Sequence, residues 1–132
     1  MTTFLLDSNV VIALASRGHP HLSRCESWFV NVTRFATCPV VEGALVRFLI
    51  RLGESVPATH AILSRIILRD GHEFWPDAVT YLDTDLSRIM GHQQVTDAYL
   101  IALVRHHPGS KLATLDEGLA KLYPEFAYLI PN

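Results

Sequence analysis

The chain has 132 residues, of which 49% are hydrophobic, and a formal net charge of −2. This length and hydrophobic content predict a single domain over residues 1–132, with a core that needs no disulfide or structural metal. The negative charge argues against a protein that binds nucleic acid through bulk positive potential. Nine of the eleven basic residues are nevertheless Arg, the side chain best suited to bidentate contacts with phosphate.

Short apolar stretches alternate with helical patterns along the chain. The pattern predicts strands at about residues 3–6, 35–38, 73–75, 111–115 and 126–130. It predicts helices over about 8–15, 21–32, 39–52, 57–69, 97–105 and 116–122, with Thr96 as an N-cap, a polar loop over 91–95 and a further helical turn or two within 84–90. Strands that alternate with helices indicate parallel pairing through right-handed crossovers. The expected fold class is α/β, a three-layer α/β/α sandwich with a mainly parallel central sheet.

Four acidic residues fall where these elements meet. Asp7 and Asp116 each follow a predicted strand, whereas Glu42 and Asp97 each lie at the start of a predicted helix. In a parallel sheet these positions share the edge at the carboxyl ends of the strands, where functional sites lie. Taken singly, Asp116 could be a helix N-cap, and Glu42 and Asp97 could favour the positive end of a helix dipole. Asp7, directly after Phe4-Leu5-Leu6, lies at the margin of the core and needs a partner.

No basic residue is placed in the sequence to neutralise four converging carboxylates, and Arg17 and Arg47 come closest. Cations are the simplest solution, and a site made only of oxygen ligands favours Mg²⁺ or Mn²⁺. Such ions polarise a phosphoryl oxygen, lower the pKa of a bound water and stabilise a leaving oxygen. The acidic cluster therefore predicts metal-dependent hydrolysis of phosphodiester bonds.

The short motifs around these acids resemble those of the PIN-domain ribonucleases, and most closely the VapC-type toxins of bacterial VapBC toxin–antitoxin modules. The matching motifs are Leu5-Leu6-Asp7-Ser8-Asn9, Pro39-Val40-Val41-Glu42 with Arg47 after it, Thr96-Asp97-Ala98 and Thr114-Leu115-Asp116. They occur in order, with suitable gaps, over nearly the whole chain. Each motif is weak alone, but four in register are fairly specific.

The resemblance implies a PIN-like fold and a Mg²⁺- or Mn²⁺-dependent endoribonuclease toxin that cleaves RNA, inhibits translation and growth, and is restrained by a cognate antitoxin. It implies that the catalytic, metal-binding acids are Asp7, Glu42, Asp97 and Asp116. Polar helpers would be Ser8, Asn9 and Thr114, and the choice between Asp116 and the adjacent Glu117 as the metal contact stays open. Similar small domains pair through helices, so a homodimer is also expected.

The antitoxin is expected to lay an apolar segment along the N-terminal helices and to bring a basic residue near the acids. These helices carry more apolar residues than one internal face need cover: Val10, Val11, Leu14, Leu22, Trp28 and Phe29.

Other readings of the sequence are weaker. His72-Glu73 begins like a zinc-protease motif, but Pro76 stands where the second His would be. Trp75-Pro76 could be exposed and stack on a base or a partner.

Two further functions stay open: a non-catalytic regulatory or binding domain with a structural ion site, and a metal-dependent DNase or phosphatase. Cys25 and Cys38 are predicted to be buried free thiols. Together with the absence of an apolar run of membrane-spanning length, they predict a cytoplasmic protein.

Overall fold

Five short strands form one fully parallel sheet in the computed structural model, which describes residues 1–132. Their order across the sheet is β3-β2-β1-β4-β5. The strands are β1 (Thr3–Leu6), β2 (Phe35–Thr37), β3 (His72–Phe74), β4 (Ser110–Thr114) and β5 (Ala127–Leu129). The chain builds the sheet outward from β1, first through β2 to β3 and then through β4 to β5. The predicted parallel sheet is confirmed.

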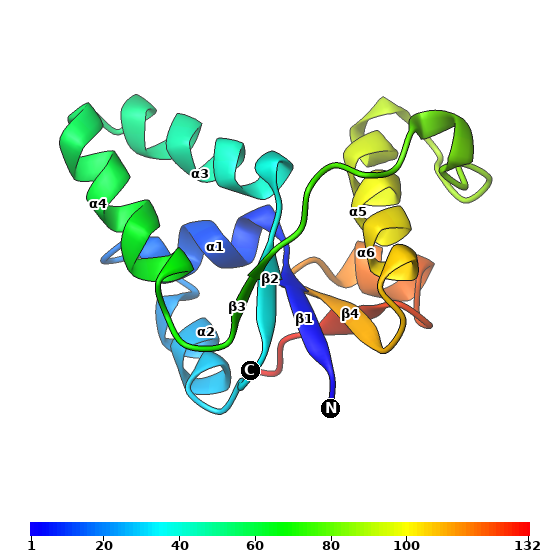
Figure 1. Ribbon diagram of the computed structural model, residues 1–132, viewed down its shortest axis with the longest axis horizontal. Coiled ribbons are helices and arrows are strands. Elements are labelled where there is room, and N and C mark those ends of the chain that lie inside the picture. The colour runs from blue at the N-terminus through cyan, green and yellow to red at the C-terminus, as the bar shows by residue number, and fades with distance from the viewer.

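Six α-helices cover the sheet: α1 (Ser8–Ala15), α2 (Leu22–Phe29), α3 (Pro39–Arg51), α4 (Val56–Ile67), α5 (Val95–His106) and α6 (Glu117–Leu122). Figure 1 shows α1 to α4 gathered on one side of the strands and α5 and α6 on the other. This division follows from right-handed crossovers, because the chain crosses the sheet in opposite directions before and after β3. The three-layer α/β/α sandwich is therefore confirmed.

The core lies between these layers and is built on the two central strands. Leu5 and Leu6 on β1, and Leu112 and Ala113 on β4, are fully buried, as expected for parallel strands covered on both faces. The two free cysteines, Cys25 and Cys38, are also buried, as predicted. No helix has both the length and the hydropathy needed to cross a membrane.

Three local predictions were wrong. Helix α5 begins at Val95, after a short 3₁₀ turn at His92–Gln94, so Thr96 lies inside the helix and is not its N-cap. The helical turn expected within 84–90 lies earlier, at Tyr81–Asp83, where the Thr80 hydroxyl caps it. Trp75 is 2% exposed and stacks face to face on His107 at a ring distance of 3.7 Å, so it cannot stack on a base.

Candidate active site

The four predicted acids all lie at the N-termini of helices. Asp7 caps α1, Asp116 caps α6, and Glu42 and Asp97 lie in the first turns of α3 and α5. The chain passes directly from β1 into α1 and from β4 into α6, so Asp7 and Asp116 lie at the carboxyl edge of the sheet. The partial positive charge of each helix N-terminus favours an anionic side chain at these positions.

Asp7 is held in place by hydrogen bonds to both of its carboxylate oxygens. It is 6% exposed, and its Oδ1 accepts from the main-chain N–H of Ser8 at 2.7 Å. Its Oδ2 accepts from the hydroxyl of Thr114 at 2.7 Å. Burial raises the pKa of Asp7 and the nearby charge of Asp116 raises it further, while the bonds from Thr114 and Ser8 oppose the shift. The position of this carboxylate is therefore fixed by β4 as well as by its own helix.

Thr114 is the centre of the polar network at this edge. Besides donating to Asp7, its fully buried hydroxyl accepts from the main-chain N–H of Asp116 at 3.0 Å and from Asn9 Nδ2 at 3.4 Å. Asn9 Oδ1 in turn accepts from the N–H of Leu115 at 3.3 Å. Thr114 and Asn9 thus bind the starts of α1 and α6 together, whereas Ser8 takes part through its main-chain N–H.

Asp97 shares its surroundings with the other two aspartates. Burial raises its pKa to about 6, and the charges of Asp7 and Asp116 contribute to the rise. Glu117, in contrast, is exposed, and its charge is not among the causes of either shift. The structure therefore brings Asp7, Asp97 and Asp116 into one electrostatic cluster, with Asp116 rather than Glu117 as the third carboxylate.

No basic side chain compensates this cluster. The three salt bridges of the molecule join other residues, and no cation is among the causes of the Asp7 and Asp97 shifts. No three Asp, Glu, His or Cys side chains converge tightly enough to enclose an ion by themselves. A set of loosely grouped carboxylates with uncompensated charge fits a hard divalent cation such as Mg²⁺. That ion usually keeps several waters and completes its shell with substrate phosphates.

Glu42 has hydrogen-bond partners of its own, and its charge is not among the causes that raise the pKa of Asp7 or Asp97. Its Oε2 accepts from the hydroxyl of buried Thr37 at 2.7 Å, and the same hydroxyl lies 2.7 Å from His72 Nε2. Because Thr37 gives its single proton to Glu42, its oxygen accepts from the His72 ring. Burial lowers the pKa of His72 against the opposing charges of Glu42 and Glu73, so the ring is neutral at pH 7.

Sequence reasoning missed Thr37 and His72 as partners of Glu42. Thr37 ends β2 and His72 begins the neighbouring β3, and their register becomes visible only when the two strands pair. The sequence pattern indicates His72 only as a possible zinc ligand.

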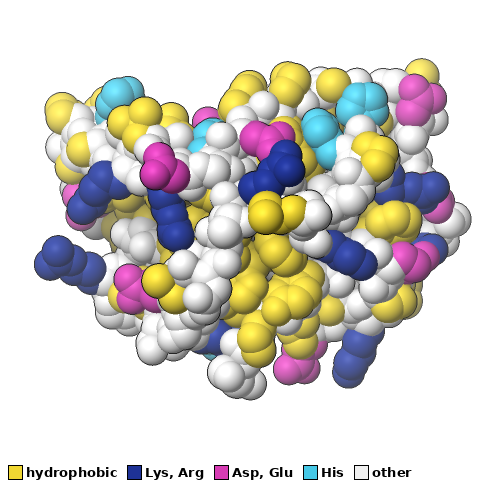
Figure 2. Space-filling model, turned by 60° about the horizontal axis from the view of Figure 1, so that its bottom comes forward, with side chains coloured by type: hydrophobic (Ala, Val, Ile, Leu, Met, Phe, Trp, Pro, Cys, Tyr) yellow, Lys and Arg dark blue, Asp and Glu magenta, His cyan; other side chains and the backbone are white.

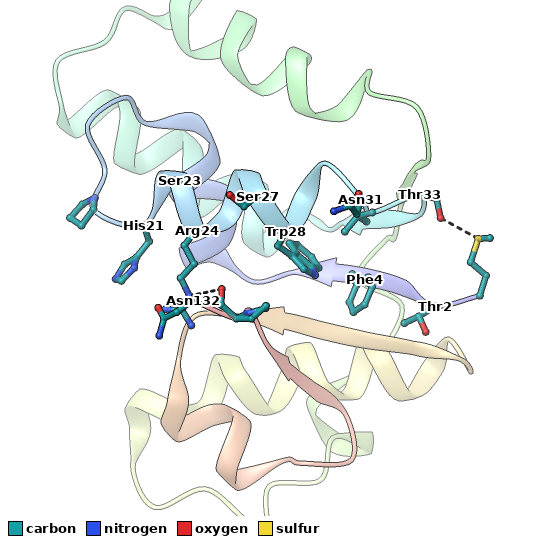
Figure 3. A pocket seen from close by; sticks show the side chains of 14 residues that line it. Thr2, Phe4, His21, Ser23, Arg24, Ser27, Trp28, Asn31, Thr33 and Asn132 are labelled. Atoms are coloured by element: carbon teal, nitrogen blue, oxygen red, sulfur yellow. Dashed lines mark hydrogen bonds between the residues drawn. The ribbon is translucent and has the colours of Figure 1, made fainter.

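A cavity of about 970 Å³ has none of the four predicted acids in its lining. It opens between α2, the start of β1 and the C-terminal segment, and Figure 3 shows Phe4, Arg24 and Trp28 among its lining side chains. Arg24 donates there to the main-chain carbonyls of Ile130 and Pro131. The lining contains no Asp or Glu side chain, so the cavity does not include the predicted acidic cluster.

Basic side chains do not form one continuous surface on the face shown in Figure 2, where Lys and Arg are scattered among apolar groups. This agrees with the net charge of −2. Binding of a nucleic acid on this face would depend on individual contacts more than on bulk potential.

Comparisons with known proteins identify the family. A family model described as the PIN domain matches residues 4–124. The chain is 48% identical over 131 residues to Ribonuclease VapC29 of Mycobacterium tuberculosis, covering 98% of each chain. It is 38% identical over 125 residues to Ribonuclease VapC38 of the same organism, covering 89% of this chain and 88% of that one.

The fold also matches a solved structure. The crystal structure of Mycobacterium tuberculosis VapC20, described as a Sarcin-Ricin loop cleaving toxin, superimposes with a TM-score of 0.73. The match covers 97% of this chain and 99% of that one at 16% sequence identity. The chain therefore belongs to the PIN-domain family and, within it, to the VapC ribonucleases.

Proposed function

We propose that this chain, an endoribonuclease toxin of the VapC family, cleaves RNA with Asp7, Asp97 and Asp116 holding a divalent cation. The observation that carries this assignment is the cluster of three aspartates without a compensating base, in which the pKa of Asp97 rises to about 6. VapC ribonucleases generally depend on divalent metal. Mg²⁺ is the proposed ion, because it binds through few carboxylates and the phosphates of its substrate, and Mn²⁺ should replace it.

The side chains have distinct tasks in this scheme. A bound cation would polarise a phosphoryl oxygen and lower the pKa of the attacking water. Thr114 orients Asp7, and the N–H of Leu119 orients Asp116 through a 3.1 Å bond to Oδ1. Glu42 is proposed as the fourth acid, because Thr37 fixes its Oε2 while Oε1 accepts no hydrogen bond from the protein and can receive a proton or a water.

RNA cleavage should disappear in excess EDTA and return on addition of Mg²⁺ or Mn²⁺. The reason is that a cluster of like charges needs a cation to bring phosphate near. Purified protein would be incubated with RNA, DNA and a small phosphoester, with and without each ion. Cleavage of RNA alone supports the assignment. Full activity in chelator would refute the metal mechanism, DNA or phosphoester cleavage would favour a DNase or phosphatase, and no cleavage would favour the non-catalytic domain.

The proposed partner is an antitoxin that binds a groove of about 600 Å³ between α1, α2 and α4. Of the apolar residues singled out in the sequence, Leu14, Leu22 and Phe29 line this groove, whereas Val10 and Val11 are fully buried in the core. The remaining one, Trp28, lines the 970 Å³ cavity instead.

Charge along the groove suggests the chemistry of the antitoxin segment. Arg17 and Arg65 line the groove, are exposed and form no salt bridge. Arg69 is engaged: it lies 3.8 Å over the Phe29 ring and donates to the Phe29 carbonyl at 2.9 Å. Exposed Glu26 also lines the groove, but the arginines outnumber it, so a segment with apolar anchors and flanking carboxylates would fit this lining. A basic residue farther along the partner would reach the aspartates, and an RNA substrate with such a partner implies action in the cytoplasm.

Val30→Glu should weaken antitoxin binding at least about tenfold while leaving RNA cleavage by the free protein unchanged, because a charge would enter an apolar contact. Val30 lines the groove and is 71% exposed. Val56→Glu is the matched control, since Val56 is 72% exposed and lies outside the groove. Binding would be measured with the product of the neighbouring reading frame. Equal binding by both variants would argue against the groove, and no binding by wild type would argue against a toxin–antitoxin pair.

A homodimer is proposed. In place of the pairing through helices that the resemblance implies, its interface is placed on the segment from the end of β3 to the start of α5, where several large apolar side chains are exposed. Leu82 is 93% exposed, Met90 83%, Phe74 53% and Tyr81 46%. Exposed side chains of this size favour contact with a partner, and a two-fold pair is the commonest assembly. Light scattering should report a dimer for wild type and a monomer for Leu82→Glu. Leu68→Glu, at a site 80% exposed at the end of α4, should remain dimeric. A wild-type monomer at tens of micromolar would contradict the proposal.

A further inference from the structure

Three side chains from three elements form a chain of hydrogen bonds that ends on Glu42. His72 begins β3, the outer strand on one side of the sheet, and Thr37 ends β2. Glu42 lies in the first turn of α3. The Thr37 hydroxyl is 2.7 Å from Glu42 Oε2 and 2.7 Å from His72 Nε2. Both are short hydrogen-bond distances, so the three groups are directly linked.

The pairing of β2 with β3 explains why His72 reaches Thr37. Phe35 is the register partner of His72, and Phe35 and Thr37 lie on the same face of β2 because side chains alternate along a strand. The His72 ring lies 5.3 Å from the Phe35 ring, centre to centre, and extends along the strand to the next side chain on that face. Spanning this offset requires a nitrogen at the far end of a long side chain.

The bond from His72 determines where the Thr37 hydroxyl points. A hydroxyl hydrogen rotates to suit its surroundings, and Thr37 is fully buried, so water cannot fix its direction. Donation from the ring nitrogen occupies the hydroxyl oxygen and leaves the hydroxyl hydrogen directed at Glu42 Oε2. Successive hydrogen bonds in one direction also polarise and strengthen one another. Loss of the ring N–H would therefore weaken the bond that holds Glu42.

The Glu42 carboxylate depends on this one bond. Thr37 is its only hydrogen-bond partner in the protein, and Glu42 forms no salt bridge. A glutamate side chain rotates about several bonds, and Glu42 is only half-buried, so a carboxylate without Thr37 would move among several rotamers. Removing the outer hydrogen-bond partner of a group in a metal site typically lowers activity about 10–100-fold.

We propose that His72 is a positioning residue for RNA cleavage: its Nε2–H donates to Thr37 and so holds the Glu42 carboxylate with Oε2 engaged and Oε1 free. This inference rests on the proposed function, in which Glu42 is the fourth acid. His72 itself touches neither RNA nor metal in this scheme. Because it acts only on the orientation of Glu42, its loss should lower kcat with little change in KM.

The activity test compares His72→Phe, His72→Asn and His72→Gln with wild type in saturating Mn²⁺. The Phe variant keeps a ring against Phe35 but has no N–H. The Gln side chain places its nitrogen as many bonds from Cβ as His Nε2, whereas the Asn side chain is shorter. His72→Phe and His72→Asn should lower kcat about tenfold with KM within about twofold, and His72→Gln should recover most of kcat. His60→Phe, at an exposed site on α4 where the ring makes no hydrogen bond, should equal wild type.

A double-mutant cycle separates positioning from a general loss of structure. Thr37→Val breaks the same chain, so adding His72→Phe to it should lower kcat no further, whereas two independent tenfold effects would multiply to about 100-fold. NMR of the metal-free protein gives a readout that does not depend on activity. The Nε2 proton of His72 should be visible in wild type, because it is hydrogen-bonded, and lost to exchange with water in Thr37→Val.

The outcomes separate the role of His72 from the ribonuclease function. Metal-dependent cleavage by wild type with an unchanged kcat in His72→Phe would overturn the role of His72 alone. Equal kcat values for the Gln and Asn variants, multiplying losses in the cycle, or a ring proton on Nδ1 would overturn it too. Absence of RNA cleavage by wild type would overturn the proposed function itself. If His72→Phe does not melt cooperatively, the Gln and Asn variants, which differ by one methylene, still decide the result.

Discussion

Replacing Asp97 with Asn should abolish RNA cleavage and, in metal-free buffer, make the protein more stable. Loss of a metal-binding carboxylate should lower cleavage by at least about 100-fold, since altering outer partners of metal ligands alone often costs 10–100-fold. The gain in stability should be about 1 kcal/mol at pH 7. The pKa of Asp97 rises from 3.8 to about 6, but solvent screening reduces the benefit of removing its charge.

The direction of the pH dependence follows from the raised pKa. The folded protein binds the Asp97 proton more tightly than the unfolded chain, so stability of the metal-free wild type falls as pH rises from about 4 to 6. The Asn variant should lack this component, and the two proteins should converge near pH 4. Thermal unfolding in EDTA at both pH values measures the difference. Asp70→Asn is the control, because exposed Asp70 precedes β3 at the opposite edge of the sheet. Near wild-type cleavage by the Asp97 variant would refute its assignment.

Thr114→Val should both destabilise the protein and disable it. The change leaves Asp7, the main-chain N–H of Asp116 and Asn9 without the hydroxyl to which they are bonded. Because Thr114 is fully buried, water cannot replace these bonds, and the expected loss is about 1–3 kcal/mol in the free energy of unfolding. Cleavage should fall about 10–100-fold, because Asp7 would no longer be oriented. Urea unfolding and RNA cleavage with Mn²⁺ measure the two effects.

Thr59→Val provides a matched control. Thr59 is also buried, at 3% exposed, but its hydroxyl has no hydrogen-bond partner. The same substitution there should leave stability unchanged or raise it, and cleavage should not change. Thr114→Ser keeps the hydroxyl and should retain most activity. If Thr114→Val cleaves as well as Thr114→Ser, the hydroxyl does not position Asp7.

Much of the fold could be predicted from local sequence. Leu5 and Leu6 lead directly into Asp7, and Leu112 and Ala113 precede Asp116 by a few residues. An apolar strand followed at once by an acid and a helix predicts a carboxylate at the end of a buried strand. Parallel pairing places all such ends at one edge. The grouping of Asp7 with Asp116 therefore needed only the strand pattern and the handedness of the crossovers.

Tertiary packing determined the contacts between distant residues, which local spacing in the sequence cannot predict. Thr114 bonds to Asp7 across 107 positions of sequence, and His72 reaches Thr37 across 35. Trp75 is buried for the same reason, a contact between residues far apart in the sequence: His107, at the end of α5, stacks on its ring. The sequence alone determined which residues can reach the carboxyl edge, because strand and helix periodicity is local. Only the packed structure determined which of them touch, because side-chain contacts between distant segments depend on how whole elements fit together.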